Sequence, residues 1–120
     1  MSLALNQIRV PLLSLQTVDE TASDWIDVRG YKYLTVYVIG TGVTTSGVIT
    51  IEEADIDPRV FAAGVVGTAS VIDTVNASTV DGSLQSAIHL DVGAYAYVRT
   101  RISTVIGGGG SISTVLHAAS

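Results

Sequence analysis

The sequence contains no cysteine, and charged residues make up only 14% of its 120 positions. Without cysteine, neither a disulfide framework nor a thiolate metal site can form. Globular domains typically contain about 25% charged residues, so this chain has few ionic groups to cover its surface, whereas 48% of its residues are hydrophobic. We therefore expect part of the apolar surplus to be buried against other subunits, in an oligomer or a larger assembly. A monomer covered by threonine and serine is the alternative.

Basic residues are also scarce, and the formal net charge is −5. They are scattered along the chain, at Arg9, Arg29, Lys32, Arg59, Arg99 and Arg101. Because no basic stripe is present to neutralise phosphates, binding to nucleic acid is not expected. The apolar N-terminal stretch is interrupted by Arg9 and Pro11, and its longest run falls far short of the ~20 residues of a membrane-spanning helix. It has no basic region of the kind that precedes a cleaved signal.

The stretch Tyr31–Gly40, YKYLTVYVIG, has the clearest strand pattern in the chain. Side chains of a strand alternate between its two faces, which gives one aliphatic face (Leu34, Val36 and Val38) and one amphipathic aromatic face (Tyr33, Thr35, Tyr37 and Ile39). This alternation predicts a central strand of an antiparallel sheet, with the rest of the chain packed on the aliphatic side.

Short β-rich segments recur along the sequence, separated by turns rich in glycine, serine and threonine. Besides 31–40 they cover residues 7–15, 25–28, 48–53, 68–76, 84–90, 94–102 and 111–118. No amphipathic helix is apparent, and residues 59–67 fit a loop, a short strand or a helical turn. The pattern predicts an all-β fold, an antiparallel β-sandwich or jelly roll of about seven to eight strands.

The domain organisation follows from length and from one proline. A chain of 120 residues is long enough for one domain that buries about two thirds of its unfolded surface. Pro11 cannot donate to a strand ladder, so its strand should lie at a sheet edge or carry a bulge. We therefore divide the chain into an N-terminal arm or edge strand at residues 1–15 and a single β-sandwich at residues 16–120. Such an arm could pair with a neighbouring subunit.

Glu52, Glu53, Asp55 and Asp57 form the one acidic cluster with metal-ligand chemistry. Calcium takes six to eight oxygen ligands, but Glu52 and Glu53 point to opposite faces of a regular strand, and the glycine-spaced pattern of a calcium-binding hand is missing. A solvated acidic turn is favoured over a calcium site, so neither a metal nor another cofactor is predicted.

His89 and His117 are the only histidines, and both fall in expected strands. A zinc site is not expected, because no other histidine or cysteine lies near either of them in the sequence. A Ser-His-Asp triad assembles in space and cannot be read from spacing, but no Gly-x-Ser-x-Gly motif is present. The four glycines at 107–110 lack the lysine that follows in a phosphate-binding loop. No catalytic set can be named, and we expect a protein that is not an enzyme.

Tyr95, Tyr97, Arg99 and Arg101 are predicted to share one face of a strand. Tyrosine and arginine are enriched at protein interfaces, so this face is a candidate contact with a sister subunit or another protein. Simple cross-strand packing on a half-exposed sheet is the alternative, and a glycan site ranks third. Arg9, Pro11 and Leu12 in the N-terminal stretch are candidate contact residues too.

The segments SDWIDVRGYKYLTVYVIG, GVITIEEADIDP and AYAYVRTRIS, followed by a glycine run and the terminal strand ISTVLHA, resemble small all-β virion proteins of tailed bacteriophages. The resemblance covers most of residues 23–118 and is closest to the head decoration type. It implies a subunit, commonly a homotrimer, that is made in the host cytoplasm and binds the major capsid protein on the outside of the shell. Such proteins strengthen the shell, and an N-terminal arm such as Ser2–Leu15 often contributes. Tail or baseplate components have similar sandwiches. A carbohydrate-binding β-sandwich that stacks sugars on Trp25, or on Tyr95 and Tyr97, is a further alternative.

Overall fold

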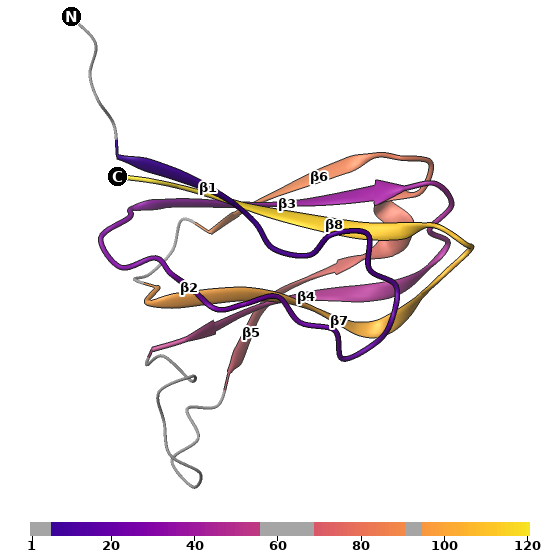
Figure 1. Cartoon of the computed structure of the whole chain (residues 1–120), viewed down its shortest axis with the longest axis horizontal. Coiled ribbons are helices and arrows are strands. Elements are labelled where there is room, and N and C mark those ends of the chain that lie inside the picture. Colours follow the sequence, from indigo (N-terminus) through magenta and orange to yellow (C-terminus); the bar gives the residue numbers. More distant parts are fainter. Residues whose placement is uncertain (1–5, 56–68, 91–94) are drawn as a thin grey trace, which may run out of the picture.

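The computed structural model describes residues 6–55, 69–90 and 95–120, which form two antiparallel sheets packed face to face (Figure 1). The strands are β1 (Gln7–Pro11), β2 (Ile26–Asp27), β3 (Tyr33–Thr41), β4 (Ser46–Ala54), β5 (Ser70–Asn76), β6 (Gln85–Leu90), β7 (Tyr97–Gly107) and β8 (Ser111–Ala119). One 3₁₀ helix, η2 (Ala77–Val80), lies between β5 and β6. The all-β prediction is confirmed, and so is the expected number of strands.

The strand order decides between the two predicted architectures. Sheet A has the order β1-β8-β3-β6 and sheet B the order β2-β7-β4-β5. The pairs β1–β8, β2–β7, β3–β6 and β4–β5 are all antiparallel, as in one long hairpin that folds back on itself. When this hairpin rolls up, β8 pairs with β3 in one sheet and β7 pairs with β4 in the other. The result is an eight-stranded jelly roll.

β3 is a central strand, as its pattern predicts, and it is bonded to β8 on one side and β6 on the other. Its aliphatic face points into the sandwich, where Val36 and Val38 are fully buried. The partner sheet contributes Ile49 and Ile51 from β4 and Val98 and Ile102 from β7 to the same core. Burying each such side chain stabilises the fold by about 1.5–3 kcal/mol. This gain determines which face of each long strand points inward.

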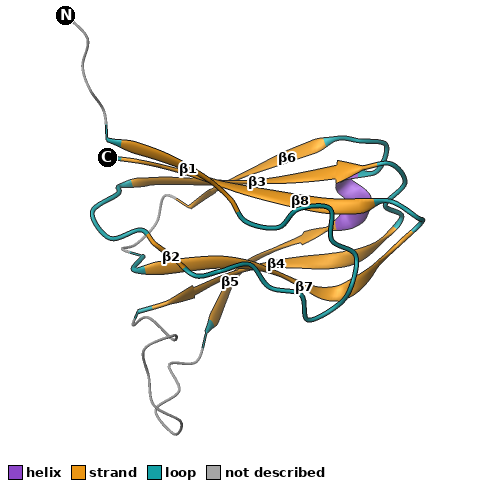
Figure 2. Ribbon diagram, viewed as in Figure 1, coloured by secondary structure: helices purple, strands orange, loops and turns teal. Residues whose placement is uncertain are grey.

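The segment between β1 and β2 joins the edges of the two sheets, and it follows them as a long loop in Figure 2. It first follows β8, where Gln16 exchanges backbone hydrogen bonds with Ile112. It then crosses to β7, where the Ser23 amide donates to the Thr100 carbonyl over 2.8 Å. Before the crossing, Leu15 lies beside β8 and has a φ of 50°, an uncommon conformation for a bulky side chain. This segment closes one side of the sandwich.

β1 ends at Pro11 and not at Leu15, and two further parts of the chain differ from the sequence-based expectation. β7 begins at Tyr97 and not at Ala94, and the turn after β5 contains the helix η2. Helix η2 packs close to β3 because Gly40 has no side chain, and a Cβ there would collide with the carbonyl of Val80. Residues 59–67, whose structure the sequence left open, lie outside the described residues. No helix in the described part of the chain is long and apolar enough to cross a membrane.

Candidate interaction surfaces

The described residues enclose no pocket, so the candidate functional surfaces are the outer faces and edges of the two sheets. They also contain no group of three or more His, Asp or Glu side chains that could hold a metal ion. The two outer faces differ in charge, and we describe them in turn.

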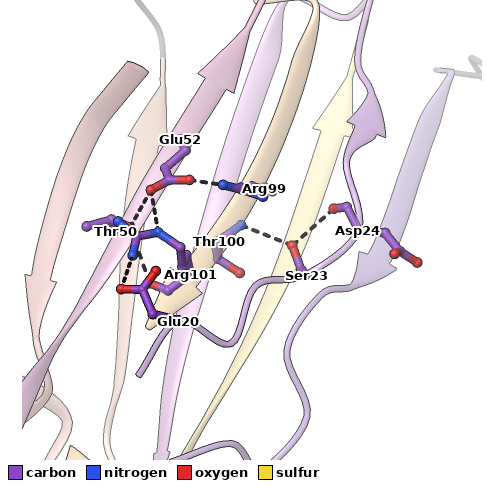
Figure 3. Close-up of polar contacts among 8 residues, drawn as sticks. All are labelled: Glu20, Ser23, Asp24, Thr50, Glu52, Arg99, Thr100 and Arg101. Carbon is purple, nitrogen blue, oxygen red and sulfur yellow. Dashed lines mark hydrogen bonds and ion pairs between the residues drawn. The ribbon is translucent and has the colours of Figure 1, made fainter. Parts of the chain in front are cut away.

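The outer face of sheet B is built around the buried carboxylate of Glu52 (Figure 3). Glu52 on β4 lies opposite Arg99 on β7, and its neighbour Thr50 lies opposite Arg101. Arg99 Nε donates to Glu52 Oε1 and Arg101 Nε donates to Oε2, each over 2.8 Å. The Thr50 hydroxyl donates to Oε2 over 3.0 Å. Arg101 also pairs with Glu20 at 2.9 Å, so one carboxylate organises two arginines from the neighbouring strand.

These contacts change the pKa of two groups. Burial raises the pKa of Glu52, but the hydrogen bonds from Arg101, Arg99 and Thr50 and the charge of Arg99 outweigh it, and the pKa of Glu52 is lower than its ordinary value. The hydrogen bond to Glu52 raises the pKa of Arg101. Both shifts favour the charged forms, so the ion pairs persist at every pH at which Glu52 is ionised.

A small aromatic cluster continues the outer face of sheet B toward β2. It consists of Trp25, Ala54 and Tyr97, which are buried against one another away from the main core. The Arg99 guanidinium lies 4.6 Å from the centre of the Trp25 ring, and that of Arg29 lies 5.4 Å from the Tyr97 ring. Cation–π contacts of this kind cover the ring faces. With exposed fractions of 7% and 8%, Trp25 and Tyr97 offer little free aromatic surface.

The structure corrects two expectations about this region. Tyr95 does not share the face of Tyr97, because it precedes β7 and packs against the main core instead. Glu52 is not part of a solvated turn, because its side chain is 3% exposed and paired with two arginines. Glu53 is half-buried and Asp55 exposed, whereas Asp57 lies outside the described residues.

The ion pairs of Glu52 were not predicted from the sequence, since the pairing of β4 with β7 joins residues 47 and 49 positions apart. The one signal for them was that Glu52, Arg99 and Arg101 all sit on outward positions of predicted strands. A carboxylate and two arginines on a charge-poor chain are natural cross-strand partners.

The strands of sheet A differ from those of sheet B in their acidic residues. None of the four strands of sheet A contains aspartate or glutamate. The strand register places one row of outward residues across the sheet, from β1 to β6: Arg9, His117, Thr35 and His89. The next row contains Pro11, Val115, Tyr37 and Ala87. Arginine, histidine and tyrosine therefore lie together on one face of the sheet.

The polar side chains of this face form a few contacts with one another. Arg9 lies 5.7 Å from the centre of the Tyr37 ring. His117 Nε2 lies 3.0 Å from Gln7 Oε1, and His89 Nδ1 lies 3.0 Å from the Thr35 hydroxyl. Tyr33, at the end of the same face, is 63% exposed. The side chains remain accessible to a partner.

The candidate contact residues of the N-terminal stretch lie in two different environments. Arg9 and Pro11 are exposed on the outer face of β1, which is the edge strand of sheet A. Leu12 instead packs against the main core, beside the buried Leu13. Residues 7–13 therefore belong to the sandwich, while residues 1–5 lie outside the described residues.

The fold and its surfaces define an eight-stranded jelly roll with a filled core and two differently charged outer faces. No protein-family model matches the sequence, and no curated protein matches it. Among solved structures, the crystal structure of the SPBc2 prophage-derived protein YomS has a similar fold, with a TM-score of 0.65 and 13% sequence identity. The match covers 100% of this chain and 98% of the other. At this identity the likeness concerns the fold.

Proposed function

We propose that this chain is a non-enzymatic structural subunit of a tailed-phage particle, and specifically a decoration protein bound to the major capsid protein on the head surface. The observation that carries the proposal is the end-to-end likeness in fold to a prophage-derived protein of nearly the same extent. A fold hosts many functions, so the surfaces have to support the proposal independently.

The surfaces favour assembly over catalysis. Among the described residues of sheet B, the arginines Arg99 and Arg101 pair with Glu52 of the same chain. The outer face of sheet A has exposed aromatic and cationic side chains, among them Tyr33 and Arg9, which are residue types enriched where proteins meet. A rigid sandwich with such a face is suited to lie on a lattice of other subunits.

A tail or baseplate position is the second candidate within the same class, because the same jelly roll could serve there. A carbohydrate-binding function is less favoured. Sugar stacking needs an open aromatic face, and in Trp25 and Tyr97 the rings are buried under arginines.

Reconstitution distinguishes head from tail. Particles of the encoding phage that lack this chain are separated into heads and tails, and each fraction is incubated with the purified protein and sedimented. We expect saturable binding to heads and a higher temperature of DNA release from the decorated heads. Binding to tails alone would support the baseplate alternative, and binding to neither fraction would overturn the proposal.

A further inference from the structure

The described acidic residues of this chain all lie outside the four strands of sheet A, and the whole chain has a net charge of −5. Four of them are exposed along the segment that follows the outer edge of β7: Asp19, Glu20, Asp24 and Asp27. We call this segment, residues 19–27, the acidic edge. Glu20 and Asp27 are paired with Arg101 and Arg29. Asp19 and Asp24 form no ion pair with any described residue, so their charge is available to a partner.

The outer face of sheet A has the opposite character. Its one arginine, Arg9, is exposed, lies over the Tyr37 ring and forms no ion pair within the described residues. Because the four strands of this sheet contain no carboxylate, an approaching anion meets no repulsion from them. The exposed Tyr33 and the half-exposed Tyr37 supply apolar contact area on the same face.

We propose that two copies of this chain associate head to tail, with the acidic edge of one copy docked on the outer face of sheet A of the next. Arg9 of one copy and Asp24 of its neighbour form the expected charge pair, and the exposed Asp19 adds negative charge to the same edge. The contact uses two different surfaces, so a pair of copies keeps one surface of each kind free, and repetition forms a ring if the rotation closes.

A second copy is the partner that the charges favour. A chain with excess negative charge repels its copies over most of its surface, and sheet A is the face where a carboxylate-bearing edge is attracted. Asp19 and Asp24 on the acidic edge and Arg9 on sheet A are exposed, and none of the three forms an ion pair with another described residue. This inference concerns contacts between copies of the chain alone. It can therefore be wrong while the proposed function in a phage particle is right, and the proposed function can be wrong while this inference is right.

Sedimentation equilibrium of the purified full-length chain tests the contact at low salt and again in high salt. We expect association that weakens as salt screens the charges. Arg9→Glu and Asp24→Arg should each reduce the association constant about tenfold or more, and the double variant should recover most of the loss because the pair is restored with its signs exchanged.

Asp73→Arg is the matched control, since Asp73 is exposed on β5, at the opposite edge of sheet B. It changes the net charge as Asp24→Arg does and should leave the association unchanged. Circular dichroism and melting of each variant establish that the fold is intact. A monomer at up to roughly 0.1 mM, where a micromolar complex would be associated, would overturn the inference. So would single variants that associate normally, a double variant as weak as the singles, or a control as weak as Asp24→Arg.

Discussion

The hydroxyl groups of Thr100 and Thr114 lie 2.6 Å apart and form a hydrogen bond between the two sheets, inside the core. Thr100 belongs to β7 of sheet B and Thr114 to β8 of sheet A, and both are fully buried. Thr114 Oγ1 also accepts a hydrogen bond from the Leu13 amide over 3.0 Å. The pair thereby connects both sheets to the segment that closes the side of the sandwich.

This arrangement predicts that the two threonines are not equivalent. Thr114→Val leaves the buried Leu13 amide without its acceptor, a loss of about 1–3 kcal/mol, whereas Thr100→Val removes only the hydroxyl pair and should cost about 1 kcal/mol. Urea unfolding of the two single variants measures both values. Equal losses, or a larger loss for Thr100→Val, would contradict this assignment.

Glu52 is expected to be the most sensitive charged residue for stability. Glu52→Gln removes the charge that compensates Arg99 and Arg101, and since the arginines are still partly solvated we expect a loss of about 2–4 kcal/mol in the free energy of unfolding. Glu20→Gln is the control, because the Glu20 side chain is 73% exposed and such surface pairs contribute about 1 kcal/mol or less. Similar effects of the two substitutions in chemical denaturation would argue against a special role for Glu52.

The lowered pKa of Glu52 predicts the direction of a pH effect. The unfolded chain binds the proton more readily than the folded one, so Glu52 stabilises the fold fully above its ordinary pKa of about 4.3. That contribution is lost as pH falls through the lower pKa of the folded state. In acid titrations followed by circular dichroism, the difference in stability between the wild type and Glu52→Gln should shrink below this range. A constant difference at all acidic pH values would count against the ion pairs.

Trp25 is the only tryptophan and reports on the aromatic cluster. Because it is 7% exposed and its ring faces Arg99, acrylamide should quench its fluorescence weakly. A panel of soluble glycans should leave its emission unchanged. Arg99→Ala uncovers the ring and should raise the quenching constant. Strong quenching of the wild type, or a saturable glycan-induced shift, would revive the carbohydrate-binding alternative.

The alternation of apolar and polar residues along single strands was enough to predict much of the fold. Leu34, Val36 and Val38 were assigned to the core from their spacing in one strand, and all three are buried. The alternation failed for Tyr95 because a side chain outside a regular strand has no fixed face. Alternation also cannot show which strands meet, so the jelly-roll order had to come from the structure.

The surfaces were less predictable, because they depend on strand pairs far apart in the sequence. Arg99 and Arg101 were correctly placed on an outward face, but their partner Glu52 was assigned to a solvated turn. The row of residues from Arg9 to His89 crosses four strands. It cannot be derived from the sequence without knowing the register of those strands. The predicted contact with a sister subunit or another protein stays a prediction for the whole set of Arg9, Pro11, Leu12, Tyr95, Tyr97, Arg99 and Arg101. The outer face of sheet A, where Arg9 and Pro11 are exposed, is the place to test it first.

The most direct test of the proposed function is quantitative mass spectrometry of gradient-purified particles from the phage or induced prophage that encodes this chain. We predict its peptides in intact particles, at a fixed ratio to the major capsid protein that persists through repeated purification. Its absence from purified particles, with the protein recovered only in the lysate, would contradict the account of this chain as a structural subunit of the virion.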